Sequence, residues 1–65
     1  MSYLYQPVYE YEKEVFGDKI KINFASSIVY NTRERARLCA LDDWNMLSSE
    51  DDTLLNIEIR QLSIG

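Results

Sequence analysis

Two stretches of apolar–polar alternation on either side of Gly17 constrain the fold most. Residues 3–16 carry tyrosine or valine at most odd positions and glutamate at three even positions, and residues 19–24 read Lys-Ile-Lys-Ile-Asn-Phe. A period of two is typical of a β-strand with one buried face and one exposed face. We therefore predict strands over residues 8–16 and 19–25.

The Gly17-Asp18 pair between these stretches is a sequence signal for a two-residue hairpin turn. In the register that this turn sets, Glu14 faces Lys21, and apolar residues face apolar residues on neighbouring rungs. Each favourable cross-strand pair contributes roughly 0.2–1 kcal/mol. Pro7 has no N–H group for a ladder hydrogen bond, so we expect the segment before it to form an edge, a bend or an arm.

The next segment has the features of a helix. Asn31-Thr32-Arg33-Glu34 offers an N-cap followed by a glutamate, which is the capping-box pattern. The following residues are rich in arginine, alanine and leucine, and no glycine or proline interrupts them. We predict a helix over residues 32–47.

Alternation returns after a polar break and predicts a last strand over residues 53–64. Leu55 is expected on the same face as Ile57 and Ile59. From Leu62 onward the apolar residues fall on the other face, which suggests a bulge or a second buried face. The order strand, strand, helix, strand predicts an α+β domain in which one helix packs on one face of a small antiparallel sheet.

The chain is too short to build a large core alone. A domain of 65 residues buries about 60% of its unfolded surface and gains about 3–5 kcal/mol from its core. Cys39 is the only cysteine, so no disulfide forms within the chain, and without histidine a structural zinc site is disfavoured. We therefore expect a homodimer or another partner to supply stabilisation.

Composition also bounds the function and the compartment. No apolar run approaches the ~18 residues of a membrane span, and the N-terminus lacks a signal-peptide pattern. The unpaired thiol suits a reducing cytoplasm, or the host cytoplasm if the chain is viral. Without histidine, a Gly-rich phosphate loop or a nucleophile paired with a base, we expect no enzyme activity and no cofactor or metal. A net charge of −4 disfavours direct nucleic-acid binding and favours a protein target with a basic surface.

A row of three glutamates projects from one face of the first predicted strand at intervals of about 6.6–6.8 Å. This spacing is close to the phosphate step along one strand of extended nucleic acid, so the row could imitate a DNA backbone. The alternative is a solvated face whose charge protects a sheet edge from aggregation. Further acids in the helix and at residues 50–52 strengthen the first interpretation, and both stay open. The acidic candidates for partner binding are Glu10, Glu12, Glu14, Asp42 and Asp43.

The aromatic residues indicate where a partner could be anchored, because tyrosine and tryptophan are enriched at interfaces. Tyr3 and Tyr5 precede Pro7 and have no partner in the hairpin register, so we place them at an interface. Tyr11 is expected to pack on the sheet. The apolar side chains of the predicted helix spread around most of its circumference, more widely than on a surface helix, and Trp44 is the expected anchor.

Arg33, Arg35 and Arg37 crowd the start of the predicted helix, where the macrodipole disfavours cations by a few tenths of a kcal/mol each. Local conflicts of this kind tend to mark function. Contacts with the glutamate row or with a second subunit would offset the cost.

Residues 31–38 resemble the basic region of basic helix-loop-helix transcription factors, in which a Glu-Arg-x-Arg core reads DNA. Glu34, Arg35 and Arg37 would occupy that core. The resemblance implies an alternative function: a dimeric nucleic-acid-binding transcriptional regulator that uses the arginines at the helix start.

The overall layout resembles small acidic phage inhibitors of uracil-DNA glycosylase. These include a dimeric type of similar length, with the order strand, strand, helix, strand and many tyrosines and acids. The acidic run at residues 50–52, followed by an alternating strand, is the most similar part. The resemblance implies a phage or viral accessory protein that imitates DNA and captures an apolar side chain of the enzyme. We therefore expect a small acidic inhibitor or modulator that occupies the basic or DNA-binding surface of a target protein.

Overall fold

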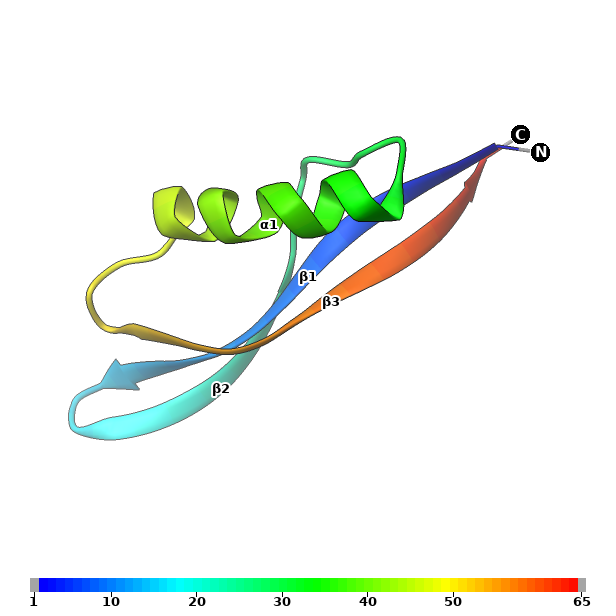
Figure 1. The fold of residues 1–65 in the computed structure, drawn as a ribbon. Coiled ribbons are helices and arrows are strands. Elements are labelled where there is room, and N and C mark those ends of the chain that lie inside the picture. Colours follow the sequence, from blue (N-terminus) through cyan, green and yellow to red (C-terminus); the bar gives the residue numbers. More distant parts are fainter. Residues whose placement is uncertain (1, 65) are drawn as a thin grey trace.

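The computed structural model describes residues 2–64. Its elements follow in the expected order: β1 (Ser2–Val15), β2 (Asp18–Ala25), α1 (Arg33–Leu47) and β3 (Asp52–Ile64). The strands form one antiparallel sheet in the order β2-β1-β3, and α1 lies along one face of it (Figure 1). The predicted α+β class, with one helix on a small antiparallel sheet, is therefore confirmed.

The central strand, β1, is longer than predicted because it begins at Ser2 and not near residue 8. The carbonyl oxygen of Pro7 accepts a hydrogen bond of 2.9 Å from the backbone N–H of Ser26, so the backbone of Pro7 faces the β2 side and not β3. The missing N–H of proline therefore costs no hydrogen bond to β3. The segment before Pro7, predicted as an edge, a bend or an arm, is instead a strand paired with β3.

The β1–β2 hairpin turns one residue earlier than predicted. Val15 pairs with Asp18, so Phe16 and Gly17 form the turn, and their φ angles are 51° and 85°. Two positive φ angles in a two-residue turn are typical of type I′, whose twist matches that of the flanking strands.

This earlier turn moves the partner of each β1 residue by two positions. Glu14 pairs with Lys19 and not with the predicted Lys21, which lies opposite Glu12. Because side chains alternate with a period of two, a shift of two residues leaves every side chain on its predicted face. The predicted pairing of acid with base is thus retained with different partners.

A bulge interrupts the pairing of β1 with β3. Glu10 pairs with Asn56 and Tyr11 with Leu54, which leaves Leu55 as the extra residue. Leu54 packs against the core, whereas Leu55 is 44% exposed. The prediction from alternation, which placed Leu55 on the buried face, is wrong at this position because the bulge exchanges the two leucines.

The change of parity near the end of β3 has a different cause. Leu62 pairs with Leu4, and no register shift occurs there. Both leucines are half-buried and lie on the face of the sheet away from α1. The change of parity therefore reflects a second buried face at this end of the sheet and not a bulge.

The core lies between β1 and α1. Ala36, Ala40 and Trp44 recur every four residues, so they share the side of α1 that faces the sheet, and all three are buried. The ring of Trp44 contacts Tyr9 at 5.4 Å and Tyr11 at 4.9 Å between centroids. The two alanines let the helix approach the sheet closely, and the three aromatic rings pack together beside them.

The caps of α1 set its length. The Thr32 side chain accepts a hydrogen bond of 3.1 Å from the backbone N–H of Arg35, so Thr32 is the N-cap and the helix begins one residue later than predicted. At the other end, the Ser48 N–H donates to the carbonyl oxygen of Trp44 at 2.8 Å. These bonds satisfy backbone groups that a helix otherwise leaves unpaired.

Candidate functional site

The glutamate row lies on the face of the sheet that α1 does not cover, which we call the open face. Tyr9 and Tyr11 of β1 pack against α1, so the even-numbered residues between and after them point the other way. Figure 1 shows α1 on one side of the sheet only. The three residues of the row are Glu10, Glu12 and Glu14.

Acids from the turn before β3 join this row. The backbone N–H of Glu14 donates to the carbonyl oxygen of Asp51 at 3.2 Å, which brings the turn beside β1. Glu12, Glu14, Glu50 and Asp51 line a hollow of about 170 Å³ together with Lys19. These four carboxylates exceed the two nearby ammonium groups, Lys19 in the hollow and Lys21 opposite Glu12, so this end of the open face is negatively charged.

A second hollow, of about 260 Å³, continues along the open face. It combines Glu10 with Glu58 and Arg60 of β3. Sequence reasoning placed Glu58 and Arg60 on a strand face but did not select them as candidates. The sequence signal that could have found them is the alternation of β3, because it places Glu58 and Arg60 on one face of the strand. Pairing of β3 with β1 makes this the face of the glutamate row.

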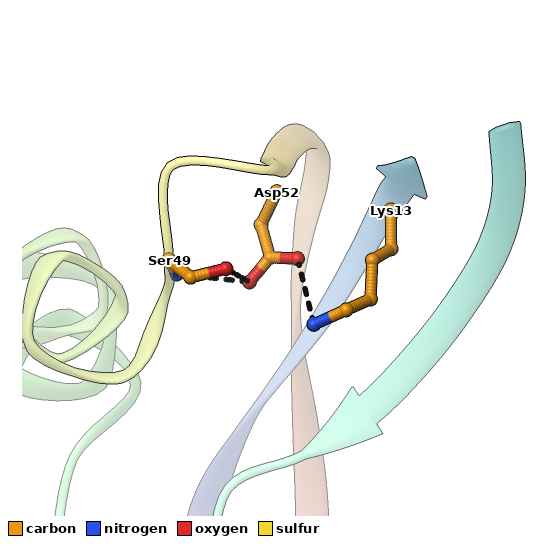
Figure 2. A network of polar contacts seen from close by, with 3 residues as sticks. All are labelled: Lys13, Ser49 and Asp52. Carbon is orange, nitrogen blue, oxygen red and sulfur yellow. Dashed lines mark hydrogen bonds and ion pairs between the residues drawn. The ribbon is translucent and has the colours of Figure 1, made fainter. Parts of the chain in front are cut away.

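Asp52, the third acid of the run at residues 50–52, makes contacts within the fold to Ser49 and Lys13 (Figure 2). The Oδ2 atom of Asp52 accepts hydrogen bonds from the backbone N–H of Ser49 at 3.0 Å and from its hydroxyl at 3.3 Å. The Oδ1 atom lies 3.6 Å from the Nζ atom of Lys13. The backbone hydrogen bond lowers the pKa of Asp52 below its ordinary value of 3.8, and the charge of Lys13 acts in the same direction against desolvation. Asp52 therefore ties the end of α1 to β1 and β3.

Asp42 and Asp43 are not part of the open face, because α1 carries them on the other side of the sheet. Asp43 accepts a hydrogen bond from the hydroxyl of Tyr30. This bond raises the pKa of Tyr30 above its ordinary value of 10.0, and burial and the charge of Asp43 add to the effect. Asp42 is exposed. The predicted acidic set therefore separates into an open-face group and a helix group.

Trp44, predicted to anchor a partner, is a core residue. Only 8% of its surface is exposed, and it packs against Tyr9 and Ala40. A buried indole is not accessible to a partner, so we no longer assign it to a binding surface. The apolar helix residues that are exposed are Leu38, Leu41, Met46 and Leu47.

The two N-terminal tyrosines lie in β1 and not in a separate arm. Tyr5 is half-buried, exchanges two backbone hydrogen bonds with Tyr30, and lies under the guanidinium of Arg33, whose Cζ atom is 5.4 Å from the ring centroid. Tyr3 pairs with Ser63 of β3 and is 40% exposed. Tyr5 thus has a structural position, and Tyr3 is the more accessible of the two.

The three arginines of α1 do not form one surface. Arg33 and Arg37 lie on the side of the helix next to β3, where Arg33 donates to the carbonyl oxygen of Ile59 at 3.4 Å. Arg35 lines a different hollow on the far side of the helix. The predicted contact of the arginines with the glutamate row does not form, because the row is on the opposite face of the sheet. Arg33 at the helix start is instead stabilised by its contacts with Tyr5 and β3.

Within residues 2–64, no group of three or more cysteine, aspartate or glutamate side chains is arranged to hold a metal ion. None of the helical segments described is long and apolar enough to cross a membrane. No family model, curated protein or solved structure gives a significant match to the chain.

Proposed function

We propose that this chain is a small acidic binding protein whose open face docks on a basic or DNA-binding surface of a target protein and blocks or modulates it. The observation that carries the proposal is the clustering of Glu12 and Glu14 with Glu50 and Asp51, four acids against Lys19 in the same hollow and Lys21 opposite Glu12. Two segments that are distant in sequence contribute to one negatively charged surface. Such a surface attracts basic partners over long range and raises their association rate.

The geometry of the row supports imitation of a nucleic-acid backbone. Alternate residues of a strand lie about 6.6–6.8 Å apart on one face, so the glutamates form a regular line of negative charge. The strand fixes the backbone of this line, so the conformational entropy lost on docking comes from the glutamate side chains alone. The resemblance to inhibitors of uracil-DNA glycosylase makes that enzyme the first target to test.

The alternative, direct DNA binding through the helix arginines, receives less support. Arg35 lies on a different side of α1 from Arg33 and Arg37. The acidic open face would also repel a phosphate backbone, whereas a DNA-binding protein needs a surplus of positive charge.

The proposal is tested by measuring excision of uracil from duplex DNA by purified uracil-DNA glycosylase in the presence of the chain. We expect inhibition by the wild type, and at least tenfold weaker inhibition at low salt by the pair Glu12→Gln with Glu14→Gln. A matched control, Glu34→Gln with Asp42→Asn, changes the charge by the same amount on the helix. It should inhibit like the wild type.

If the glycosylase is unaffected, that target is wrong, and the general proposal is tested by affinity capture at low and high salt. A captured protein supports it when the wild type and the helix control bind this protein and displace it from DNA, while the open-face variant does not. Equal capture by all three proteins would contradict an acidic docking face. Salt-dependent binding of duplex DNA by the chain itself would support the alternative.

A further inference from the structure

The outer edge of β3 has no strand partner within residues 2–64, although one of its outward carbonyl groups, that of Ile59, accepts a hydrogen bond of 3.4 Å from the Arg33 side chain. The backbones of Tyr5 and Pro7 face the β2 side, where they bond to Tyr30 and Ser26, so the intervening residues of β1 face β3. Their partners in β3 are the even-numbered residues, such as Arg60 opposite Gln6. The odd-numbered residues between them therefore direct N–H and C=O groups away from the sheet. Within residues 2–64, no strand pairs with this edge.

The edge is long, and the monomer has an unusually large surface. β3 has 13 residues, and a long exposed edge is a template for pairing with another chain. The accessible surface is 4948 Å², whereas a compact chain of 7.7 kDa has about 4300 Å². The radius of gyration is 13.1 Å, against about 11 Å for a compact domain of this length. The excess area, about 600 Å², is one partner's share of a small stable interface.

A groove of about 570 Å³ runs beside this edge, between β3 and α1. Its apolar lining consists of Leu41, Ile57 and Ile59, and the charged residues Arg33, Arg37 and Glu58 line the rest. Leu41, on the helix side of the groove, is 54% exposed. The backbone edge and the groove together offer hydrogen bonds and apolar contact to the same occupant.

We propose that a second copy of this chain occupies the edge, with the two β3 strands antiparallel about a two-fold axis at Ile59. In this register Ile59 lies opposite Ile59 of the second copy, and Glu58 lies opposite Arg60 of the second copy. Symmetry repeats the Glu58–Arg60 pair, so each dimer has two. Neither residue makes an ion pair within residues 2–64 of one chain, so both charges are available.

Charge selects this register over its neighbours. The residues whose backbone N–H and C=O groups point away from the sheet must pair with the same kind of residue in the second copy. The two neighbouring registers that meet this condition place Glu58 opposite Glu58 or Arg60 opposite Arg60 of the second copy. Like charges directly opposite one another destabilise a strand pair. The other sheet edge, β2, is shorter and carries Lys19 and Lys21 on one face, a pattern that protects edges from pairing.

The resulting dimer has one continuous six-stranded sheet. A two-fold axis perpendicular to the sheet puts both helices on one face and both open faces on the other. Arg33 and Arg37 of the two copies then lie near the axis on the helix side, and their like charges oppose association. The Arg33 side chain must also leave the Ile59 carbonyl oxygen, which then accepts from the N–H of Ile59 in the second copy. The Glu58–Arg60 pairs, the new backbone hydrogen bonds and the contact of Ile59 and Leu41 across the axis must exceed both costs. This dimer is independent of the target proposed above.

Sedimentation equilibrium of the full chain tests the proposal, using variants that reverse the paired charges. We expect a wild-type dimer of twice 7.7 kDa at micromolar concentration. Glu58→Arg or Arg60→Glu alone should raise the dissociation constant about tenfold or more, because each creates two like-charge pairs. Mixing these two variants should restore a one-to-one dimer, and so should combining both substitutions in one chain.

Cysteine cross-linking tests the position of the axis. In a chain with Cys39→Ala, Ile59→Cys should form an intermolecular disulfide on oxidation, since residues directly opposite are within about 5.5 Å between Cα atoms. Ile57→Cys in the same background is the control. Each Ile57 would lie about 14 Å from its counterpart, too far for a disulfide.

Three results would overturn the proposal. A folded wild-type monomer at high micromolar concentration would exclude the dimer. A dimer that tolerates both single charge reversals would exclude the register. Cross-linking through Ile57→Cys and not Ile59→Cys would place the axis elsewhere. Circular dichroism of each variant establishes that it is folded before its mass is measured.

Discussion

The hydroxyl of Tyr9 donates a hydrogen bond of 3.1 Å to the carbonyl oxygen of Ala40. This bond joins the central strand to the middle of α1, and both residues are fully buried. Burial is the main cause that raises the pKa of Tyr9, with the charge of Asp43 second. In a monomer with so small a core, one buried polar contact between the two layers makes an appreciable contribution to stability.

Removing this hydroxyl should measurably destabilise the fold. Tyr9→Phe keeps the ring contacts but deletes the donor to Ala40, and we expect a loss of about 0.5–1.5 kcal/mol in the free energy of unfolding. Urea denaturation at fixed protein concentration measures it. Tyr11→Phe, which keeps its own contact with Trp44, is the control. A Tyr9→Phe variant as stable as the control would show that the hydrogen bond contributes little.

A substitution in the β1–β2 hairpin turn should stabilise the fold. Phe16 has a φ angle of 51° and a fully exposed side chain. Bulky residues are strained in this region, whereas Asn-Gly is the preferred type I′ pair. Phe16→Asn should therefore raise the free energy of unfolding by about 1 kcal/mol. Phe16→Ala removes the ring and keeps the strain, so equal gains from both variants would attribute the effect to the ring and not to the backbone.

Asp52 should give the fold a dependence on acid pH. Its pKa in the folded chain is lower than the ordinary value of 3.8, so its contribution is complete above that pH. The contribution is lost as the pH falls through the lower pKa of the folded chain. Asp52→Asn should be less stable than the wild type near neutrality, and the difference should shrink below pH 3.8. Asp42→Asn, at an exposed helix position, should show no such convergence in thermal melts.

Tyr30 should ionise late in an alkaline titration. The hydrogen bond to Asp43 raises its pKa above 10.0, so the unfolded chain releases this proton first. The stability that this hydroxyl contributes is complete below pH 10.0 and is lost as the pH rises above it. In a pH titration followed by the ultraviolet absorbance of tyrosinate, the Tyr30→Phe variant should lack a component that the wild type shows at high pH. In Asp43→Asn the same component should titrate at lower pH, and an unchanged curve would argue against the contact.

The glutamate row should control association with a target more than dissociation from it. Replacing Glu10, Glu12 and Glu14 by glutamine should slow association by about an order of magnitude at low salt, with little effect on the dissociation rate. The difference should shrink as salt screens the charges. Surface plasmon resonance at several salt concentrations measures both rates. A change confined to the dissociation rate would mean that these side chains are buried contacts.

The local patterns of the sequence determined the elements and their order. Alternation placed the glutamates and the tyrosines of β1 on opposite faces, and this held although the hairpin register moved by two residues. The start of α1 was predicted to within one residue, because the N-cap is Thr32 and not Asn31 of the predicted capping box. These features depend on backbone periodicity and on neighbours within a few residues, so the sequence is sufficient to predict them.

Features that depend on distant partners were decided by the tertiary structure. The bulge at Leu55 arises in the pairing of β3 with β1, and alternation within β3 alone placed this residue on the wrong face. Because apolar side chains spread around most of the helix, the sequence predicted Trp44 as an anchor for a partner. In the structure, two tyrosine rings of β1 pack against it and bury it. The acids at residues 50–52 separate into the open face and the Lys13 contact because the turn packs beside β1. Each of these outcomes depends on contacts between segments far apart in the chain, and local periodicity does not encode those contacts.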